Sequence, residues 1–285
     1  MTRLDVPAFP GPLPPATPPA GTAVFQLPTG SYATRAALAF RGGRWRDRRD
    51  FAATAVLVRH PAGDLLIDAG FGAGAAQHVR TLPGYRRSPH RLGATARQQL
   101  DAAGYDLRGL LGVVLTHSHW DHVSGLDSLD VPVWTAPGER QHAERARDDR
   151  VFSLVTGGHE HREYAFDGPA HAGFDASHDV HGDGSVVLVP AAGHTPGSVV
   201  VFVTVASGRR FAFIGDLTWQ LEGITRRAER PALVRALADS EPSGVRRDLA
   251  RVIALADRVH LVPAHDQRAY DPIPRLTAGA LAAVP

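Results

Sequence analysis

The sequence predicts an α/β protein whose sheets are covered by helices, and three observations support this prediction. Short apolar runs rich in Val, Leu, Ile and Phe recur along the chain, and segments with apolar residues at helical spacing lie between them. After residue 20, no stretch of linker-like composition divides the chain. A chain of 285 residues can also form one large core. We therefore expect a single α/β domain over residues 21–285.

The first twenty residues differ in composition from the rest of the chain. Proline is crowded there, which favours an extended polyproline arm with no packed core. Both disorder and packing against a partner subunit fit such an arm, so a homodimer stays open. The prolines of the arm, residues 1–20, are Pro7, Pro10, Pro12, Pro14, Pro15, Pro18 and Pro19.

The expected strands are short and are bounded by turn residues. Pro61-Ala62-Gly63-Asp64 separates two of them and is typical of a hairpin turn. The run at 112–115 is too short and too β-branched for a helix. The expected strands cover residues 23–27, 53–60, 65–68, 112–115, 186–189, 199–205, 211–214 and 259–262.

Two segments have the spacing of amphipathic helices. In the first, at about residues 92–103, apolar residues recur every four positions, and Gly104 follows where a glycine commonly ends a helix. In the second, at residues 245–256, the apolar residues fit one face and arginines occupy most of the other.

Composition excludes several kinds of chemistry. The chain contains no Lys, which excludes a lysine Schiff base and a P-loop lysine. It contains no Cys, so any metal must be held through nitrogen and oxygen. The net charge of +2 does not require a polyanionic partner.

The densest run of charge lies at residues 44–50. Its arginines are interrupted by Asp47 and Asp50, which favours a solvated loop over a nucleic-acid-binding surface. We therefore expect a small-molecule substrate and no nucleic-acid partner. No signal peptide is recognisable, and no apolar run reaches the roughly 20 residues that span a bilayer. These features favour a cytoplasmic protein with no membrane partner.

The strongest functional signal follows the expected strand at 112–115. Four metal-binding side chains occur within six residues there: His117, His119, Asp121 and His122. Imidazole and carboxylate suit zinc, iron or manganese. In an extended backbone His117 and His119 share one face, and Asp121 and His122 can then reach a second ion.

Three further candidate ligands follow strands elsewhere in the sequence. His194 lies in a Gly-His-Thr-Pro-Gly turn between two expected strands, and Asp216 and His265 follow the strands at 211–214 and 259–262. Loops that converge at strand ends are common positions for binding sites. Together with the first cluster, these residues complete two coordination spheres. Five other histidines, at 159–181, favour a surface insertion with exposed side chains over an accessory metal site.

These motifs, from His117-x-His119-x-Asp121-His122 to Gly-His194-Thr-Pro-Gly, Gly-Asp216 and His265, resemble the metallo-β-lactamase-fold hydrolase superfamily. The resemblance covers about residues 23–275. It implies an α/β fold of four layers, an αββα sandwich with the metals at one edge. It further implies one ion bound by His117, His119 and His194, a second bound by Asp121, His122 and His265, and Asp216 bridging them. Asp68 resembles the aspartate that stands behind the family's ligands, although a turn role after a strand is an alternative.

The two implied ions suggest a mechanism. Two divalent ions roughly 3.5–4 Å apart share a water molecule and lower its pKa to near 7, which produces a hydroxide nucleophile. Zinc is the expected metal, and iron, manganese and cobalt also fit the ligands. Asp121 is the candidate catalytic residue, which orients the hydroxide and accepts its proton.

Within the superfamily, the layout most resembles the N-acyl-homoserine lactonase and esterase branch. Those lactonases carry a Tyr three residues after the bridging aspartate, where this chain has Trp219. Trp120 and Trp219 are candidate apolar walls for a substrate, with a core role as the alternative. We expect hydrolysis of a lactone or carboxylic ester with an apolar tail. The alternatives are a phosphoester hydrolase, acting on an organophosphate, cyclic nucleotide or RNA end, and a non-catalytic metal-binding protein.

Overall fold

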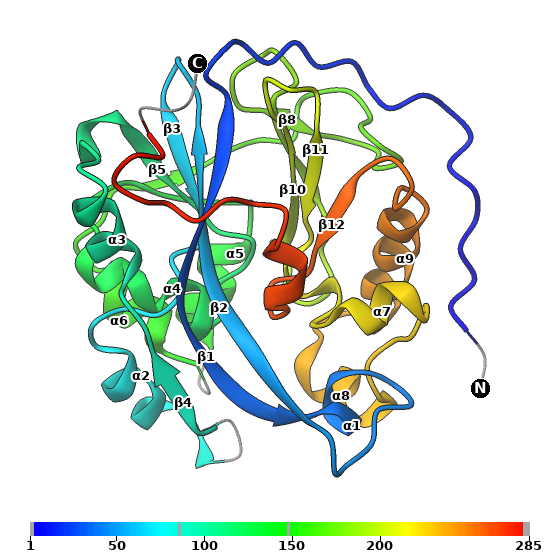
Figure 1. Cartoon of the computed structure of the whole chain (residues 1–285). Coiled ribbons are helices and arrows are strands. Elements are labelled where there is room, and N and C mark those ends of the chain that lie inside the picture. The colour runs from blue at the N-terminus through cyan, green and yellow to red at the C-terminus, as the bar shows by residue number, and fades with distance from the viewer. Residues whose placement is uncertain (1–2, 85–86, 147–148, 282–285) are drawn as a thin grey trace.

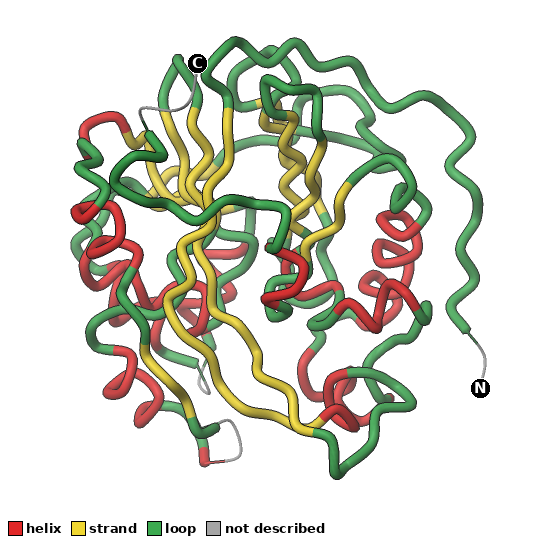
Figure 2. The backbone as a smooth tube through the Cα atoms, in the orientation of Figure 1, coloured by secondary structure: helices red, strands yellow, loops and turns green. Residues whose placement is uncertain are grey.

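Two β-sheets pack face to face between two layers of helices. The computed structural model describes residues 3–84, 87–146 and 149–281, so the final residues of the expected domain, 282–285, lie outside the described part. Figure 1 shows the helices gathered on the two outer sides of the molecule, and Figure 2 shows the strands between them. The predicted αββα sandwich is therefore confirmed.

The first sheet has seven strands in the order β4-β1-β2-β3-β5-β6-β7. Its first half is antiparallel, and the pairings β3·β5, β5·β6 and β6·β7 are parallel. The strands are β1 (Ala23–Arg35), β2 (Arg48–Arg59), β3 (Asp64–Ile67), β4 (His90–Leu92), β5 (Leu110–Val114), β6 (Val133–Thr135) and β7 (His161–Glu163).

The second sheet has five strands in the order β12-β11-β10-β9-β8. It is antiparallel except for the parallel pair β11·β12. Its strands are β8 (His178–Asp179), β9 (Val186–Pro190), β10 (Val199–Thr204), β11 (Arg210–Phe213) and β12 (His260–Val262).

Helices cover the outer face of each sheet (Figure 1). Over the first sheet lie α2 (Ala75–Thr81), α3 (Ala96–Ala102), α4 (Trp120–Val123), α5 (Glu139–Arg145) and α6 (Val151–Thr156). On the side of the second sheet lie α7 (Leu221–Thr225), α8 (Ala232–Ala238) and α9 (Pro242–Ile253), and the short α1 (Ala36–Ala39) follows β1. Within the described ranges, no helix combines the length and the apolar character that crossing a membrane requires.

Strand alternation sorts the apolar side chains into separate layers. On β2, Val56 and Val58 belong to the cluster between the sheets, whereas Ala55 and Leu57 belong to the cluster beneath the helices. This follows from the two-residue period of a strand, because successive side chains point to opposite faces. Both faces are apolar, which explains why these strands read as continuous apolar runs.

The hairpin of β1 and β2 is longer than the sequence predicts. Pro28 and Gly30 are typical of a strand end. Instead, β1 continues to Arg35 across a register shift between these two residues, so that it stays paired with β2. Such a bulge lets a strand change direction without losing its partner. The extension carries Tyr32 to the edge of the sandwich where the candidate ligands lie.

The helix predicted at 92–103 begins later than expected. Leu92 ends β4 and is 47% exposed, and the helix α3 starts after Thr95. Thr95 and Gln98 form a reciprocal capping box that fixes this start, and Gly104 has a φ of +71° where the helix ends. The apolar spacing therefore placed the start of the helix too early, because it did not take the capping signal at Thr95 and Gln98 into account.

The proline-rich arm lies against its own chain. The sequence left open whether the arm is disordered or packs against a partner subunit. In the structure, Leu4 is buried in the cluster around α9, and Phe9 and Leu13 pack against the same cluster. Backbone carbonyls of the arm accept hydrogen bonds from Arg210 and Arg258. Figure 1 shows the arm running along the outside of the second sheet and α9. Apolar side chains between the prolines anchor it there.

We predict that Leu4→Ala lowers the free energy of unfolding by about 2 kcal/mol, because it empties a buried position under the arm. Leu233→Ala is the matched control, since Leu233 is 73% exposed and its loss costs about 0.5 kcal/mol or less. Urea denaturation of both variants measures the difference. Equal effects would show that the arm is detached in solution.

Candidate metal centre

The structure brings together all seven side chains that the sequence singled out as ligands. They lie at one edge of the sandwich, in segments that follow strands. The loop after β5 carries two of them and α4, which follows that loop, carries two more; the turn between β9 and β10 carries one, and the segments after β11 and β12 carry one each. The seven are His117, His119, Asp121, His122, His194, Asp216 and His265.

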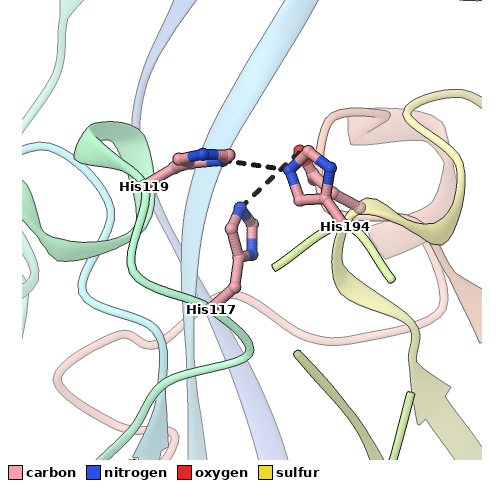
Figure 3. Close-up of side chains that lie close together, drawn as sticks. His117, His119 and His194 are labelled. Atoms are coloured by element: carbon pink, nitrogen blue, oxygen red, sulfur yellow. Dashed lines mark hydrogen bonds and ion pairs between the residues drawn. The ribbon is translucent and has the colours of Figure 1, made fainter. Parts of the chain in front are cut away.

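One group of ligand atoms is formed by His117, His119, His194 and Asp216. The four atoms lie within 4.8 Å of one another. Nε2 of His194 is 3.0 Å from Nδ1 of His119 and 3.2 Å from Oδ2 of Asp216. Figure 3 shows the three imidazoles converging on one point from two loops.

The second group is formed by Asp121, His122 and His265, whose ligand atoms also lie within 4.8 Å of one another. Nε2 of His265 is 3.5 Å from Oδ2 of Asp121 and 3.4 Å from Nε2 of His122. All three side chains are buried.

Asp216 lies between the two groups. Its Oδ2 is 3.2 Å from His194 and 3.7 Å from His117, whereas its Oδ1 is 3.1 Å from His265 and 3.6 Å from His122. Gly215, with a φ of +49°, turns the chain directly after β11 and places Asp216 there. Each carboxylate oxygen therefore faces a different group.

The donor set fits bound cations. Nε2 of His117 and Oδ1 of Asp216 are buried and have no hydrogen-bond partner among the residues that the structure describes. A buried polar atom without a partner costs about 1–3 kcal/mol. In the second group, Nε2 of His122 and Nε2 of His265 lie 3.4 Å apart. Nδ1 of each of these rings donates elsewhere, so both Nε2 atoms are acceptors when the rings are neutral and cannot satisfy one another. A divalent cation in each group would satisfy all of these atoms through nitrogen and oxygen ligands.

The charges of the cluster are strongly coupled. Burial and the neighbouring His122 hold the pKa of His117 well below its usual value. Burial also disfavours the charged form of His122, but Asp68 and Asp216 raise its pKa well above the usual value. Burial opposes ionisation of Asp216, yet the surrounding histidines hold its pKa well below the usual value. A cation that binds at Nε2 of His122 must therefore compete with a proton that this ring holds more tightly than a free imidazole does.

The comparison with known proteins gives the family. A model described as the metallo-beta-lactamase superfamily matches residues 48–265, a range that includes every ligand position. The chain belongs to the metallo-beta-lactamase superfamily. A probable metallo-hydrolase of Mycobacterium tuberculosis is 28% identical over 238 residues, which is 75% of this chain and 74% of that protein. Family and ligand cluster together identify a metallo-hydrolase.

Several solved structures share the fold of this chain. An N-acyl homoserine lactone hydrolase, solved with the product N-hexanoyl-L-homoserine at its catalytic metal center, superposes with a TM-score of 0.70 at 14% identity, over 90% of this chain and 97% of that chain. A probable metal-dependent hydrolase from Staphylococcus aureus superposes with a TM-score of 0.58 at 14% identity, over 88% and 91% of the chains. A dizinc quorum-quenching lactonase gives 0.57 at 15% identity, over 85% and 87%.

Hydrogen bonds behind the ligands orient the imidazoles of this superfamily member. Nδ1 of His122 donates to Asp68 at 2.7 Å, and Nδ1 of His265 donates to the carbonyl of Ala52 at 2.8 Å. Asp68 also accepts from the backbone N–H of Thr116 at 2.7 Å, and its backbone has a φ of +56°. The structure thus places Asp68 behind a ligand and not only in a turn. Such bonds fix the ring so that Nε2 points to the centre.

Sequence reasoning missed Asp239, which performs the same task for His194. Its Oδ1 lies 2.9 Å from Nδ1 of His194, and Arg230 donates to the same oxygen. The Asp239 side chain is fully buried. It lies between α8 and α9, where an Asp looks like an ordinary helix cap, so no local signal distinguishes it.

Glu139 is a second residue that the sequence did not reveal. Its two carboxylate oxygens accept hydrogen bonds from the backbone N–H groups of Ser118, at 2.7 Å, and Gly197, at 2.9 Å. Glu139 is 1% exposed. A Cβ at position 197 would collide with Glu139, so a glycine is required. Glu139 therefore ties the loop of the first ligands to the loop of His194.

A cleft of about 450 Å³ opens onto the ligands. Ala143, Ala146, Leu237 and both predicted tryptophans contribute apolar surface to it. Among the described residues that line it, none is an arginine. Trp120 is buried and stacks on Phe71 with ring centroids 5.1 Å apart, so it belongs to the core as well as to the cleft wall.

Trp219 also does more than form an apolar wall. Its indole N–H donates to Oδ2 of Asp216 at 2.7 Å. The guanidinium of Arg230 lies over the indole ring, 4.6 Å from its centroid. The polar atom of Trp219 therefore contacts Asp216, the carboxylate that lies between the two groups.

The five histidines at 159–181 are half-buried, which corrects the expectation that their side chains are exposed. His159, for example, hydrogen-bonds the carbonyls of Val131 and Leu126. His60 stacks on His181 at 3.7 Å. Among the described residues, none of these histidines belongs to a group of metal-ligand atoms.

We predict that Asp239→Asn weakens metal binding by about 10- to 100-fold, because His194 loses a charged acceptor that fixes its ring. Competition with a chromophoric chelator measures the affinity. Asp175→Asn is the control, since the Asp175 side chain is 93% exposed and its ion pair with Arg251 involves none of the ligands. An unchanged affinity in Asp239→Asn would contradict the orienting role.

Proposed function

We propose that this chain is a dinuclear metal-dependent hydrolase that cleaves a lactone or carboxylic ester with an apolar tail. The observation that carries the proposal is the placement of Asp216, whose two oxygens face two separate groups of ligand atoms. A carboxylate shared in this way suits a pair of cations that act on one substrate.

The residues for each ion follow from the two groups. His117, His119 and His194 would hold one ion, Asp121, His122 and His265 the other, and Asp216 both. Zinc suits this set best, and iron, manganese or cobalt would also fit it. When bound, such a pair polarises a carbonyl oxygen and lowers the pKa of a bound water molecule to near 7.

Asp121 is the proton acceptor that we propose. It is 6% exposed, lines the cleft and lies beside His265. A buried carboxylate at this position can orient the attacking water and take up its proton. The proton can then pass to the alcohol that leaves when the ester bond breaks.

The side chains that line the cleft favour a neutral substrate with an apolar part. Alanine, leucine and tryptophan side chains line it, and the described lining residues include no arginine that would bind a phosphate or carboxylate tail. The cleft volume of about 450 Å³ is that of a small-molecule site. The fold that the chain shares with N-acyl homoserine lactone hydrolases supports a lactone as the first substrate to test.

We predict turnover of N-acyl-homoserine lactones or aryl esters by the metal-replete protein. Asp121→Asn should lower kcat by about 100-fold or more, since a general base contributes about 10²–10⁴-fold. His194→Ala should abolish turnover, and the variant should bind one metal ion fewer than the wild type. His90→Ala, which changes a histidine outside both groups, should leave the rate unchanged.

The same panel separates the proposal from its alternatives. Faster turnover of bis-p-nitrophenyl phosphate than of any ester would contradict the ester proposal and favour a phosphoester hydrolase. No turnover of any substrate by protein with two bound ions would favour a non-catalytic metal-binding protein.

A further inference from the structure

Tyr32 reaches the candidate metal centre from a strand that the sequence did not connect with it. Its hydroxyl donates a hydrogen bond to Oδ2 of Asp121, at 2.8 Å. The side chain is half-buried and lines the cleft. Asp121 is a member of one ligand group only. The hydroxyl therefore contacts the centre at a ligand that is not shared.

The phenol ring is held in a fixed position. Tyr32 is paired with Phe51 on β2 and with His90 on β4, so its backbone lies within three hydrogen-bonded strands. Its ring packs edge-on against Phe51, with centroids 5.3 Å apart, and against His265, at 5.7 Å. It also lies 5.5 Å from Trp120. A hydroxyl on such a support is pre-organised.

Tyr32 has a counterpart that contacts the other carboxylate of the centre. Trp219 donates its indole N–H to Oδ2 of Asp216 at 2.7 Å. One aromatic donor thus holds the shared carboxylate, and another holds the unshared one. Because the indole N–H of Trp219 is bonded to Asp216, Trp219 does not replace Tyr32 as the hydrogen-bond donor to Asp121.

We propose that Tyr32 is a positioning residue that sets the affinity of the Asp121–His122–His265 group for its ion. A carboxylate can rotate about two side-chain bonds, and the donated hydrogen bond selects one orientation of Asp121. The inference rests on the proposed function in one respect, that each group binds an ion.

The test is Tyr32→Phe, which removes one oxygen atom and keeps the ring. Protein loaded with two equivalents of Zn²⁺ is titrated with a chromophoric chelator, and the release of each ion is followed. We expect one ion to bind about 10- to 100-fold more weakly and the other to bind as in the wild type. Because Asp121 is the proposed proton acceptor, kcat should also fall while KM changes little.

Tyr164→Phe is the matched control. The Tyr164 hydroxyl is buried and has no hydrogen-bond partner among the described residues, so its loss should not change metal binding. A second comparison sets the double variant Asp121→Ala/Tyr32→Phe against Asp121→Ala alone. The added Tyr32→Phe change should not further lower the affinity for the ion that is bound more weakly. This non-additivity would show that Tyr32 acts through Asp121, which loss of packing alone would not produce.

Three outcomes would overturn the proposal. Two ions bound by Tyr32→Phe as tightly as by the wild type would refute the role of Tyr32 and leave the dinuclear hydrolase standing. Equal weakening of both ions would indicate a general structural defect and not control of one group. A wild-type protein that binds only one ion would refute both this inference and the proposed dinuclear function.

Discussion

The buried carboxylate of Asp216 is the constraint on which the rest of the site depends. An ionised carboxylate inside a protein is costly unless positive charge surrounds it. Here, four imidazoles lie within 3.1–3.7 Å of its two oxygens, two on each side. The two ligand groups are therefore halves of one electrostatic unit, and cations are its natural counter-charge. The strand ends, capping residues and loops around it can be understood as the means of keeping this unit assembled.

Three kinds of support hold the unit together. The sandwich brings the ends of β5, β11 and β12 to one edge. β11 and β12 are parallel neighbours and so finish at the same edge of the second sheet, and the packing of the two sheets places the end of β5 beside them. Asp68 and Asp239 accept hydrogen bonds from two of the imidazoles and fix their orientation. Glu139 joins the loops that carry the first group. The apolar layers therefore supply the stability of the fold, and the polar contacts behind the ligands fix the orientation of the imidazole rings.

Much of the site could be predicted because ligand-type residues concentrate at strand ends. The cluster from His117 to His122 is contiguous, and the more distant ligands follow recognisable strands. Asp239, Glu139 and Tyr32 could not be predicted in the same way, because tertiary packing alone brings them to the centre. Pro28 and Gly30 also led to a predicted strand that ends before Tyr32, because both residues are typical of strand ends. In the structure, a bulge lets the strand continue past them. The sequence predicted the αββα layers but could not show that the proline-rich arm packs on its own chain.

An anomalous difference map from crystals of the metal-replete protein would test the central claim most directly. The account predicts two peaks on either side of Asp216, one among His117, His119 and His194 and the other among Asp121, His122 and His265. A single peak, or peaks among the histidines of residues 159–181, would contradict it.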